Sequence, residues 1–321
     1  MNKPKKLKLF FSLAFFALVV VSLLNFQTLR DFFVSKIFSP SEAMLAVENS
    51  LNLTTYGKTL FRASSPELED NETFNENCKT AAATSTVLGC YTNEKIHIFH
   101  VESDEFPGII ESTSAHELLH ASWARLSEKE KSNFSGTLEA ILESSGDDFK
   151  KSLESYADTE KLEEIYVRSA TQLKALPESL EKHFATIFSD QDSVVDFYES
   201  YSAPFLALEE NLSNISSELD DLRTKIDTAS AEYSSNMENF TKEVEEFNSC
   251  AETVGCFSNS VFFTRRNELL SKQAAIESLY QTLDDTVTLY NEKVETYNSQ
   301  VIYGQHLENL INSNKKPKES L

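Results

Sequence analysis

Residues 114–121 read SAHELLHA, and this octet organises the first two-thirds of the chain. In an α-helix, residues four apart lie one turn apart on the same side, so His116 and His120 can reach a single ion. Glu117 lies beside them, where its carboxylate can take a proton from a metal-bound water. The octet therefore predicts a helix that carries two metal ligands and a general base.

The same arrangement, H-E-x-x-H, is typical of zinc metallopeptidases. A surface helix that merely carries two histidines is the alternative. Three features favour the metal site: a strand pattern precedes the helix, an arc of residues beside the histidines predicts one buried flank, and a candidate third ligand follows downstream. The arc comprises Ala115, Leu118, Leu119, Ser122 and Leu126.

A catalytic zinc ion keeps three protein ligands and one open position, so the octet needs a partner. The metzincin continuation is excluded, because Trp123 replaces the required glycine and Leu126 replaces the third histidine. The other common solution is a glutamate from a second helix. Glu160, Glu163 and Glu164 follow His120 by about 40 residues. Spacing alone leaves all three open as the third ligand.

Composition limits both the fold and the partners. Glycine and proline are scarce among the 321 residues, at seven each, which favours a largely helical protein over an all-β one. The formal net charge of −22 repels nucleic acid phosphates. We therefore expect no nucleic acid partner.

The first 38 residues predict a membrane anchor with a juxtamembrane stretch. An uncharged apolar run covers residues 9–26, and about 18 such residues can span a bilayer core. A removed signal peptide is the alternative, but residues 23–27 offer no small-x-small cleavage site. Basic residues before the run predict a single-pass protein of the cell membrane with a cytoplasmic N-terminus and an extracytoplasmic body. They are Lys3, Lys5, Lys6 and Lys8.

The four cysteines form two local couples, Cys78 with Cys90 and Cys250 with Cys256. Neither spacing is that of a C-x-x-C metal pair. In an oxidising extracytoplasmic compartment both couples would close as disulfides. Four unrelated free thiols in a reducing compartment are the alternative.

Helix signals dominate the segment around the octet. Ser39 as cap and Pro40 in the first turn predict a helix that ends near residue 52. Residues 60–86 are polar and irregular, which predicts a loop. A capping-box pattern at residues 127–130 begins another helix, and apolar residues at helical spacing continue beyond it.

A small β-hairpin is predicted just before the octet. Residues 87–91 and 95–101 have strand patterns with turn residues between them, and the H-E-x-x-H helix follows over residues 112–126. His97 and His100 point to opposite faces of their strand, so they cannot form a ligand pair. We interpret both as structural.

The last third of the chain has a different pattern. Two apolar heptad stripes, over residues 208–247 and 269–301, are nearly equal in length and flank the second cysteine couple. They predict an antiparallel coiled-coil hairpin over residues 205–304 with a disulfide-closed tip, followed by a disordered tail to residue 321. Two helices that pack elsewhere are the alternative. The predicted fold is thus mainly α, with a small β-hairpin in a zincin-like α+β module over residues 39–204 and a long helical hairpin after it.

Several segments resemble the gluzincin-type zinc metallopeptidase module of bacterial envelope proteins in which such a module is joined to a coiled coil. The resemblance covers residues 75–201. The segments that carry it are residues 87–91, 113–121, 156–157, 162–166, 170–172 and 176–184. In that family pattern the ligand glutamate follows an asparagine. The resemblance implies Glu164 as third ligand, with Glu163 in place of the asparagine and Tyr166 in place of a histidine.

The resemblance implies a membrane-anchored zinc metallopeptidase that hydrolyses peptide bonds with one Zn²⁺ and Glu117 as general base. Its partners would be a peptide or protein substrate and, on the coiled coil, a further protein. The strand ending at Val101 could offer its edge to an extended substrate. The expected donors to a tetrahedral oxyanion are Tyr156, Tyr166, Arg168 and His183. The alternative is a non-catalytic envelope scaffold whose hairpin binds a partner and whose zinc fold is relict or structural.

Overall fold

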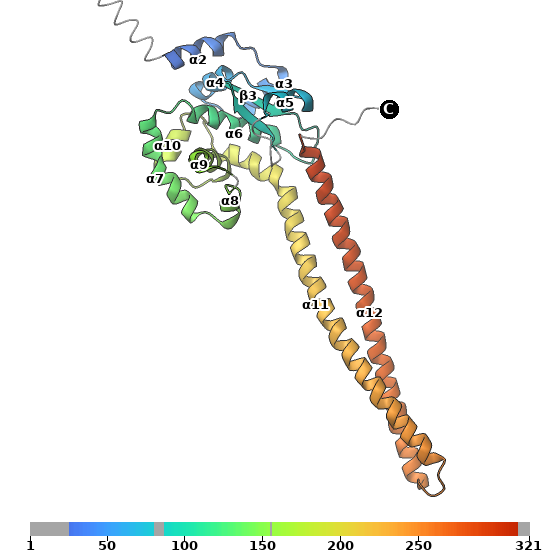
Figure 1. Cartoon of the computed structure of the whole chain (residues 1–321). Helices are drawn as coiled ribbons and strands as arrows, with labels where there is room; N and C mark the ends of the chain where they lie inside the picture. The colour runs from blue at the N-terminus through green and yellow to red at the C-terminus, as the bar shows by residue number, and fades with distance from the viewer. Residues whose placement is uncertain (1–25, 80–86, 155, 314–321) are drawn as a thin grey trace, which may run out of the picture. The chain divides into compact units, whose positions relative to one another are not determined.

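The computed structural model describes residues 26–79, 87–154 and 156–313 (Figure 1). It confirms the predicted fold class, because helices dominate, the sheet is small and a long helical hairpin follows. The chain divides into two compact units. The first comprises residues 1–204 and 308–321, and the second comprises residues 205–307.

The helices of the first unit that precede α11 (Asp192–Ala251) are short. They are α2 (Phe26–Ile37), α3 (Glu42–Ser50), α4 (Thr55–Ala63), α5 (Asn71–Asn77), α6 (Ile109–Trp123), α7 (Glu128–Ser144), α8 (Asp147–Lys151), α9 (Asp158–Gln172) and α10 (Glu178–Phe184). The predicted capping box at Ser127 is confirmed, since its hydroxyl and the Glu130 carboxylate each accept a hydrogen bond from the other's backbone N–H. The predicted cap at Ser39 is wrong. Ser41 caps α3 instead, because its hydroxyl accepts a hydrogen bond from the Met44 N–H.

Three strands form the sheet in the order β1-β3-β2: β1 (Glu67–Glu69), β2 (Gly89–Thr92) and β3 (Lys95–Phe99). The predicted hairpin is confirmed, with Thr92 paired to Lys95 across the turn. Both turn residues, Asn93 and Glu94, have positive φ, as two-residue hairpin turns of type I′ require.

The segment predicted as a loop, residues 60–86, is partly regular. It contains the end of α4, all of β1, which pairs parallel with β3, and all of α5. A three-residue strand with glutamates at both ends carries no apolar alternation, which explains why the pattern concealed it. The pairing also makes β3 the central strand, so the prediction that the strand ending at Val101 offers a free edge is wrong.

Helix α6 forms the centre of the first unit's core. It packs on β2 and β3 and against α9 (Figure 1). Ala115, Leu118 and Leu119 are fully buried, and each leucine contributes about 2 kcal/mol by leaving water. The sequence predicted burial of one flank of this helix, but more of its surface is buried. Ser112, Ser114 and Glu117 are buried as well, so polar groups of this helix are held inside the protein.

The two strand histidines differ in environment. His97 is buried, and its Nδ1 lies 2.7 Å from Glu69 Oε1 across the β1–β3 pair. His100 has an exposed side chain, with Nδ1 3.7 Å from Glu102. Neither contacts the other, in agreement with their interpretation as structural residues.

The second unit consists of the arms of α11 (Asp192–Ala251) and α12 (Asn259–Ile311), which run antiparallel side by side within residues 205–307 (Figure 1). Leu208, Leu222 and Ile276 are buried between the arms. Ion pairs such as Lys293–Glu218 join them. The tail was expected to be disordered from residue 305, but α12 continues to Ile311, so that expectation is wrong for these residues.

Both predicted disulfides are formed. Cys78–Cys90 joins the end of α5 to β2, with Cα atoms 5.9 Å apart. Cys250–Cys256 closes the connection between α11 and α12, with Cα atoms 5.5 Å apart. The first disulfide therefore stabilises the strand that lies next to the H-E-x-x-H helix, and the second stabilises the hairpin tip.

Among the helices of residues 26–79, 87–154 and 156–313, none has the length and apolar character to cross a bilayer. The predicted anchor falls on residues 1–25, outside the described residues. The predicted juxtamembrane stretch overlaps α2, where Phe32, Phe33 and Ile37 are exposed.

Candidate metal centre

Helix α6 places the two histidines of the octet as its periodicity predicts. His116 Nε2 and His120 Nε2 lie 3.3 Å apart. Two imidazole nitrogens that point at each other repel as lone pairs unless a proton or a cation lies between them. At this distance one imidazole must donate an N–H to the other, or a cation must lie between them.

Helix α9 adds a carboxylate to the pair. Glu164 Oε1 lies 3.3 Å from His120 Nε2, and Oε2 lies 3.9 Å from His116 Nε2. One ligand atom from each of the three residues lies within 4.8 Å of the others. Tetrahedral zinc with bonds of about 2.0–2.1 Å separates its ligand atoms by about 3.3 Å. The donor set and its spacing therefore fit a zinc ion.

The other two candidate glutamates lie elsewhere. Glu163 Oε1 is 2.7 Å from His120 Nδ1, the imidazole nitrogen that faces away from the cluster. A carboxylate there keeps the proton on Nδ1 and leaves the Nε2 lone pair for a metal. Glu160 is exposed on the surface of α9. Among the three, Glu164 alone has a carboxylate in the cluster with both histidines, and Glu163 holds His120 from the other side.

Glu117 lies beside the cluster with only 5% of its surface exposed. The Tyr91 backbone N–H donates a hydrogen bond to its carboxylate. Burial raises the pKa of Glu117 to about 7, because water no longer stabilises the charged form. A carboxyl with this pKa can both accept and return a proton near neutral pH.

The charges of the metal-free cluster are unequal. Burial and the neighbouring His120 lower the pKa of His116 to about 3, so this imidazole is neutral. Burial acts against charge on His120 as well, but hydrogen bonds to Glu163 and Glu164 raise its pKa to about 10. Burial opposes ionisation of Glu164, yet its bond with His120 lowers the pKa of Glu164 to about 2. One proton on His120 thus supplies the positive charge that a metal would bring, and metal binding would release it.

Two of the four predicted oxyanion donors lie at the site. Arg168 Nε donates to Glu164 Oε2 at 3.2 Å, and its terminal nitrogen lies 3.4 Å from the Tyr156 hydroxyl. Arg168 and Tyr156 line a cavity of about 180 Å³ together with His116 and Glu117. These two side chains can donate hydrogen bonds into the space next to the ligands.

The other two predicted donors, Tyr166 and His183, do not reach this cavity. Tyr166 is fully buried, and its hydroxyl lies 2.7 Å from His183 Nε2 and 3.0 Å from Ser122 Oγ. The aromatic ring packs 5.0 Å from the Trp123 ring. Tyr166 therefore supports the packing of α6 on α9, and His183 contacts Tyr166 from α10. Neither residue lines the cavity, so the expectation that they act at the site is wrong.

The sequence interpretation missed part of the cavity. Tyr198 and Tyr201, on the first turns of α11, line the cavity opposite α6. Their rings meet edge to face, with centroids 5.4 Å apart. Two tyrosines three apart on a helix would have indicated a shared face, but nothing local connects that face with residues about 80 positions earlier.

Comparisons with family models, curated proteins and solved structures found no match. The interpretation of the site therefore depends on its own geometry and chemistry.

Proposed function

We propose that this protein is a zinc-dependent peptidase, anchored to the membrane with its body on the extracytoplasmic side. The observation that carries the proposal is a cluster of three zinc-type donor atoms, one of them on His116, which lines a cavity together with a buried glutamate of raised pKa. Two disulfides are in keeping with an oxidising compartment.

His116, His120 and Glu164 would hold the metal, with Glu163 orienting His120 from behind. Zinc bound there would act as a Lewis acid that lowers the pKa of a water and polarises a carbonyl. One carboxylate ligand leaves such a site with a net charge of about +1. With three protein ligands, a zinc ion held there would keep one position for a water or a substrate carbonyl.

The remaining chemistry belongs to the protein. Glu117 would accept the proton of the attacking water and return it to the leaving amine, which its raised pKa permits. Arg168 and Tyr156 would donate hydrogen bonds to the negative charge that develops on the carbonyl oxygen. Burial of the site strengthens these interactions, because little water competes.

A sheet edge lies beside the cavity and suits an extended substrate. Residues 87–89 line the cavity, and β2 is an edge strand of the sheet. The Tyr91 N–H of this edge already donates to Glu117, and the other outward backbone groups of such a strand can bind an extended peptide as an additional strand. We therefore propose a peptide in extended conformation as substrate, held along β2 with its scissile carbonyl toward His116.

The test combines zinc content with turnover of the purified full chain on an unfolded protein substrate. We expect one zinc ion per chain in wild type and in Glu117→Gln, and a loss of activity of about 100-fold or more in the variant. Stoichiometric zinc with equal activity in both proteins would contradict the proposal. That outcome would favour the scaffold whose zinc site is relict or structural.

Three glutamates of α9 provide matched controls for the ligand set. Glu164→Ala should abolish zinc binding, because a metal ligand is lost. Glu163→Gln should weaken zinc binding by about 10- to 100-fold, as the loss of a carboxylate behind a ligand histidine does. Glu160→Gln, on the exposed surface of the same helix, should leave affinity unchanged. Zinc affinity measured with a competing chelator distinguishes the three.

A further inference from the structure

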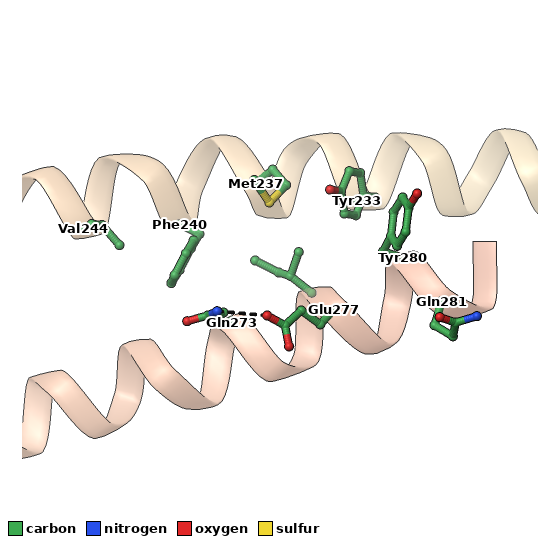
Figure 2. A pocket seen from close by; sticks show the side chains of 9 residues that line it. Tyr233, Met237, Phe240, Val244, Gln273, Glu277, Tyr280 and Gln281 are labelled. Atoms are coloured by element: carbon green, nitrogen blue, oxygen red, sulfur yellow. Dashed lines mark hydrogen bonds between the residues drawn. The ribbon is translucent and has the colours of Figure 1, made fainter. Parts of the chain in front are cut away.

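An apolar groove of about 730 Å³ lies within the helical hairpin, far along the chain from the metal ligands (Figure 2). Residues of both arms line it. They are Tyr233, Met237, Phe240 and Val244 on α11 and Gln273, Ile276, Glu277, Tyr280 and Gln281 on α12. Figure 2 shows Phe240 pointing from its helix toward the opposite arm.

The sequence explains why the arms leave this space. The apolar stripe of α11 is irregular here, since Ala229, Tyr233 and Met237 follow one another at spacings of four and four. On α12 the stripe position at residue 273 is a glutamine. Interrupted heptads pack less completely than regular ones. Met237 and Tyr280 accordingly remain 36% and 52% exposed, although each is a stripe residue.

The dimensions of the groove suit a helix. Its α11 wall runs from Tyr233 to Val244, which is about 16 Å at the rise of an α-helix, or three turns. An amphipathic helix presents anchors over that length at every third or fourth position. A third helix lying on the two arms would bury the side chains that the arms leave exposed.

The surroundings of the groove are acidic. Residues 229–248 and 269–285 contain eight acidic residues and two lysines. Both lysines are already paired with glutamates, Lys242 with Glu238 at 2.6 Å and Lys272 with Glu243 at 2.5 Å. The remaining charge is negative, and Glu277 carries part of it into the groove itself.

We infer that this groove binds an amphipathic helix of a partner protein, with lysines or arginines on both sides of its apolar stripe. The apolar lining matches the apolar stripe of such a helix, and the length of the groove matches three of its turns. The net negative charge around the groove matches its lysines or arginines. A second copy of this chain suits the groove less well, because its own net charge is −22. The inference concerns the hairpin alone and is independent of the metal chemistry.

The test uses two synthetic helical peptides of 18 residues with leucines at every third or fourth position. One has lysines beside the leucines, and the other has glutamates. Anisotropy of the labelled peptides, titrated with the full chain, should show saturable binding of the lysine peptide only. Its affinity should fall with added salt, because the charges are at the surface.

Variants inside and outside the groove test whether the peptide binds there. Phe240→Glu should weaken binding of the lysine peptide by about 10-fold or more, as the loss of an apolar anchor does. Glu277→Lys, an exposed change that leaves the packing intact, should weaken it by about 3- to 10-fold. The controls Leu289→Glu and Glu292→Lys lie on the same helix outside the groove and should not alter binding. Equal helix content by circular dichroism completes the comparison.

Three outcomes would overturn the inference. One is equal binding of both peptides; another is a lysine-peptide affinity that neither groove variant changes. The third is a dimer of the full chain in sedimentation that Phe240→Glu dissociates, since this result would assign the groove to a second copy.

Discussion

Glu117 shows how the surroundings of one residue determine its chemistry. The same side chain on a solvated helix would be an ordinary acid. Here it is enclosed by β2 and α6, so burial moves the pKa of its carboxyl to about 7. The octet places this glutamate next to the two histidines, whereas the fold supplies the low dielectric that raises the pKa of its carboxyl.

This raised pKa predicts a pH-dependent stability in the metal-free protein. The folded-state pKa of Glu117 lies above the unfolded value of 4.5, so the folded protein holds this proton more tightly. The resulting contribution to the free energy of unfolding is fully present below pH 4.5 and is lost as the pH rises through about 7. Glu117→Gln removes the buried charge. We expect the variant to equal wild type at pH 4 and to be more stable by about 1 to 3 kcal/mol at pH 8.

Urea unfolding of the metal-free protein at the two pH values measures this difference. The control is Glu160→Gln, which removes an exposed carboxylate from α9 and should show the same small effect at both pH values. An equal stability of Glu117→Gln and wild type at pH 8 would contradict the burial of a charged Glu117.

The candidate ligands show which site residues helix periodicity can predict and which it cannot. Helix periodicity predicts that His116 and His120 lie together, because residues four apart share one face of a helix. Glu163 and Glu164 are adjacent and point about 100° apart on α9, so the choice between them depends on how α9 is rotated against α6. Packing of Ile165, Tyr166 and Ala170 in the core sets that rotation. Only the tertiary structure contains this information.

At the scale of elements, the contact between β2 and α6 is unusually close. A Cβ atom at Gly89 would lie 2.7 Å from the Cγ and Oε1 atoms of Glu117 and 2.7 Å from Thr113 Cγ2. Any larger residue must displace the strand or the Glu117 side chain. Gly89 is therefore required by close approach of a strand to a helix.

Gly89→Ala should destabilise the protein by about 1 to 3 kcal/mol, because the added methyl group overpacks the contact. It should also lower turnover by displacing Glu117. The matched control is Gly136→Ala, since Gly136 lies within α7 with no atom within 4 Å of its added Cβ. The control should stabilise the protein by about 0.5 to 1 kcal/mol. Thermal unfolding with a peptidase assay compares the two, and a neutral Gly89→Ala would be inconsistent with the packing.

A buried arginine joins elements that the sequence separates widely. Arg125, just after α6, donates to both carboxylate oxygens of Asp31 on α2, at 2.8 and 3.0 Å, and to the Tyr91 hydroxyl on β2 at 2.9 Å. Tyr91 in turn donates its backbone N–H to Glu117. Helix α2 is thus connected to the site through two side chains. No local pattern predicts a contact across 94 positions.

At the scale of the whole molecule, each of the two units has its own disulfide. Cys78–Cys90 belongs to the first unit, next to the strand that lines the cavity. Cys250–Cys256 belongs to the hairpin. The two bonds therefore allow the units to be perturbed one at a time.

Replacing Cys78 and Cys90 by serine should lower the stability of the first unit by about 3 kcal/mol, mainly because the unfolded chain gains freedom. Zinc content should fall with it, since β2 loses its connection to α5. The matched control is the double serine variant of Cys250 and Cys256, which should retain full zinc content. Metal analysis and calorimetry of both variants measure the effects. A loss of zinc in the hairpin variant would show that the two units depend on each other.

The sequence by itself determined the helical class, the hairpin of heptads, both disulfides and three residues of the site. All of these depend on spacing within a short segment or on the count and pairing of a rare residue. The tertiary structure decided the choice of Glu164 as the residue facing the histidines, the central position of β3, the exclusion of Tyr166 and His183 from the cavity and the inclusion of Tyr198 and Tyr201. Each of these depends on the rotation and pairing of elements distant in the chain, and core packing sets these where local periodicity does not.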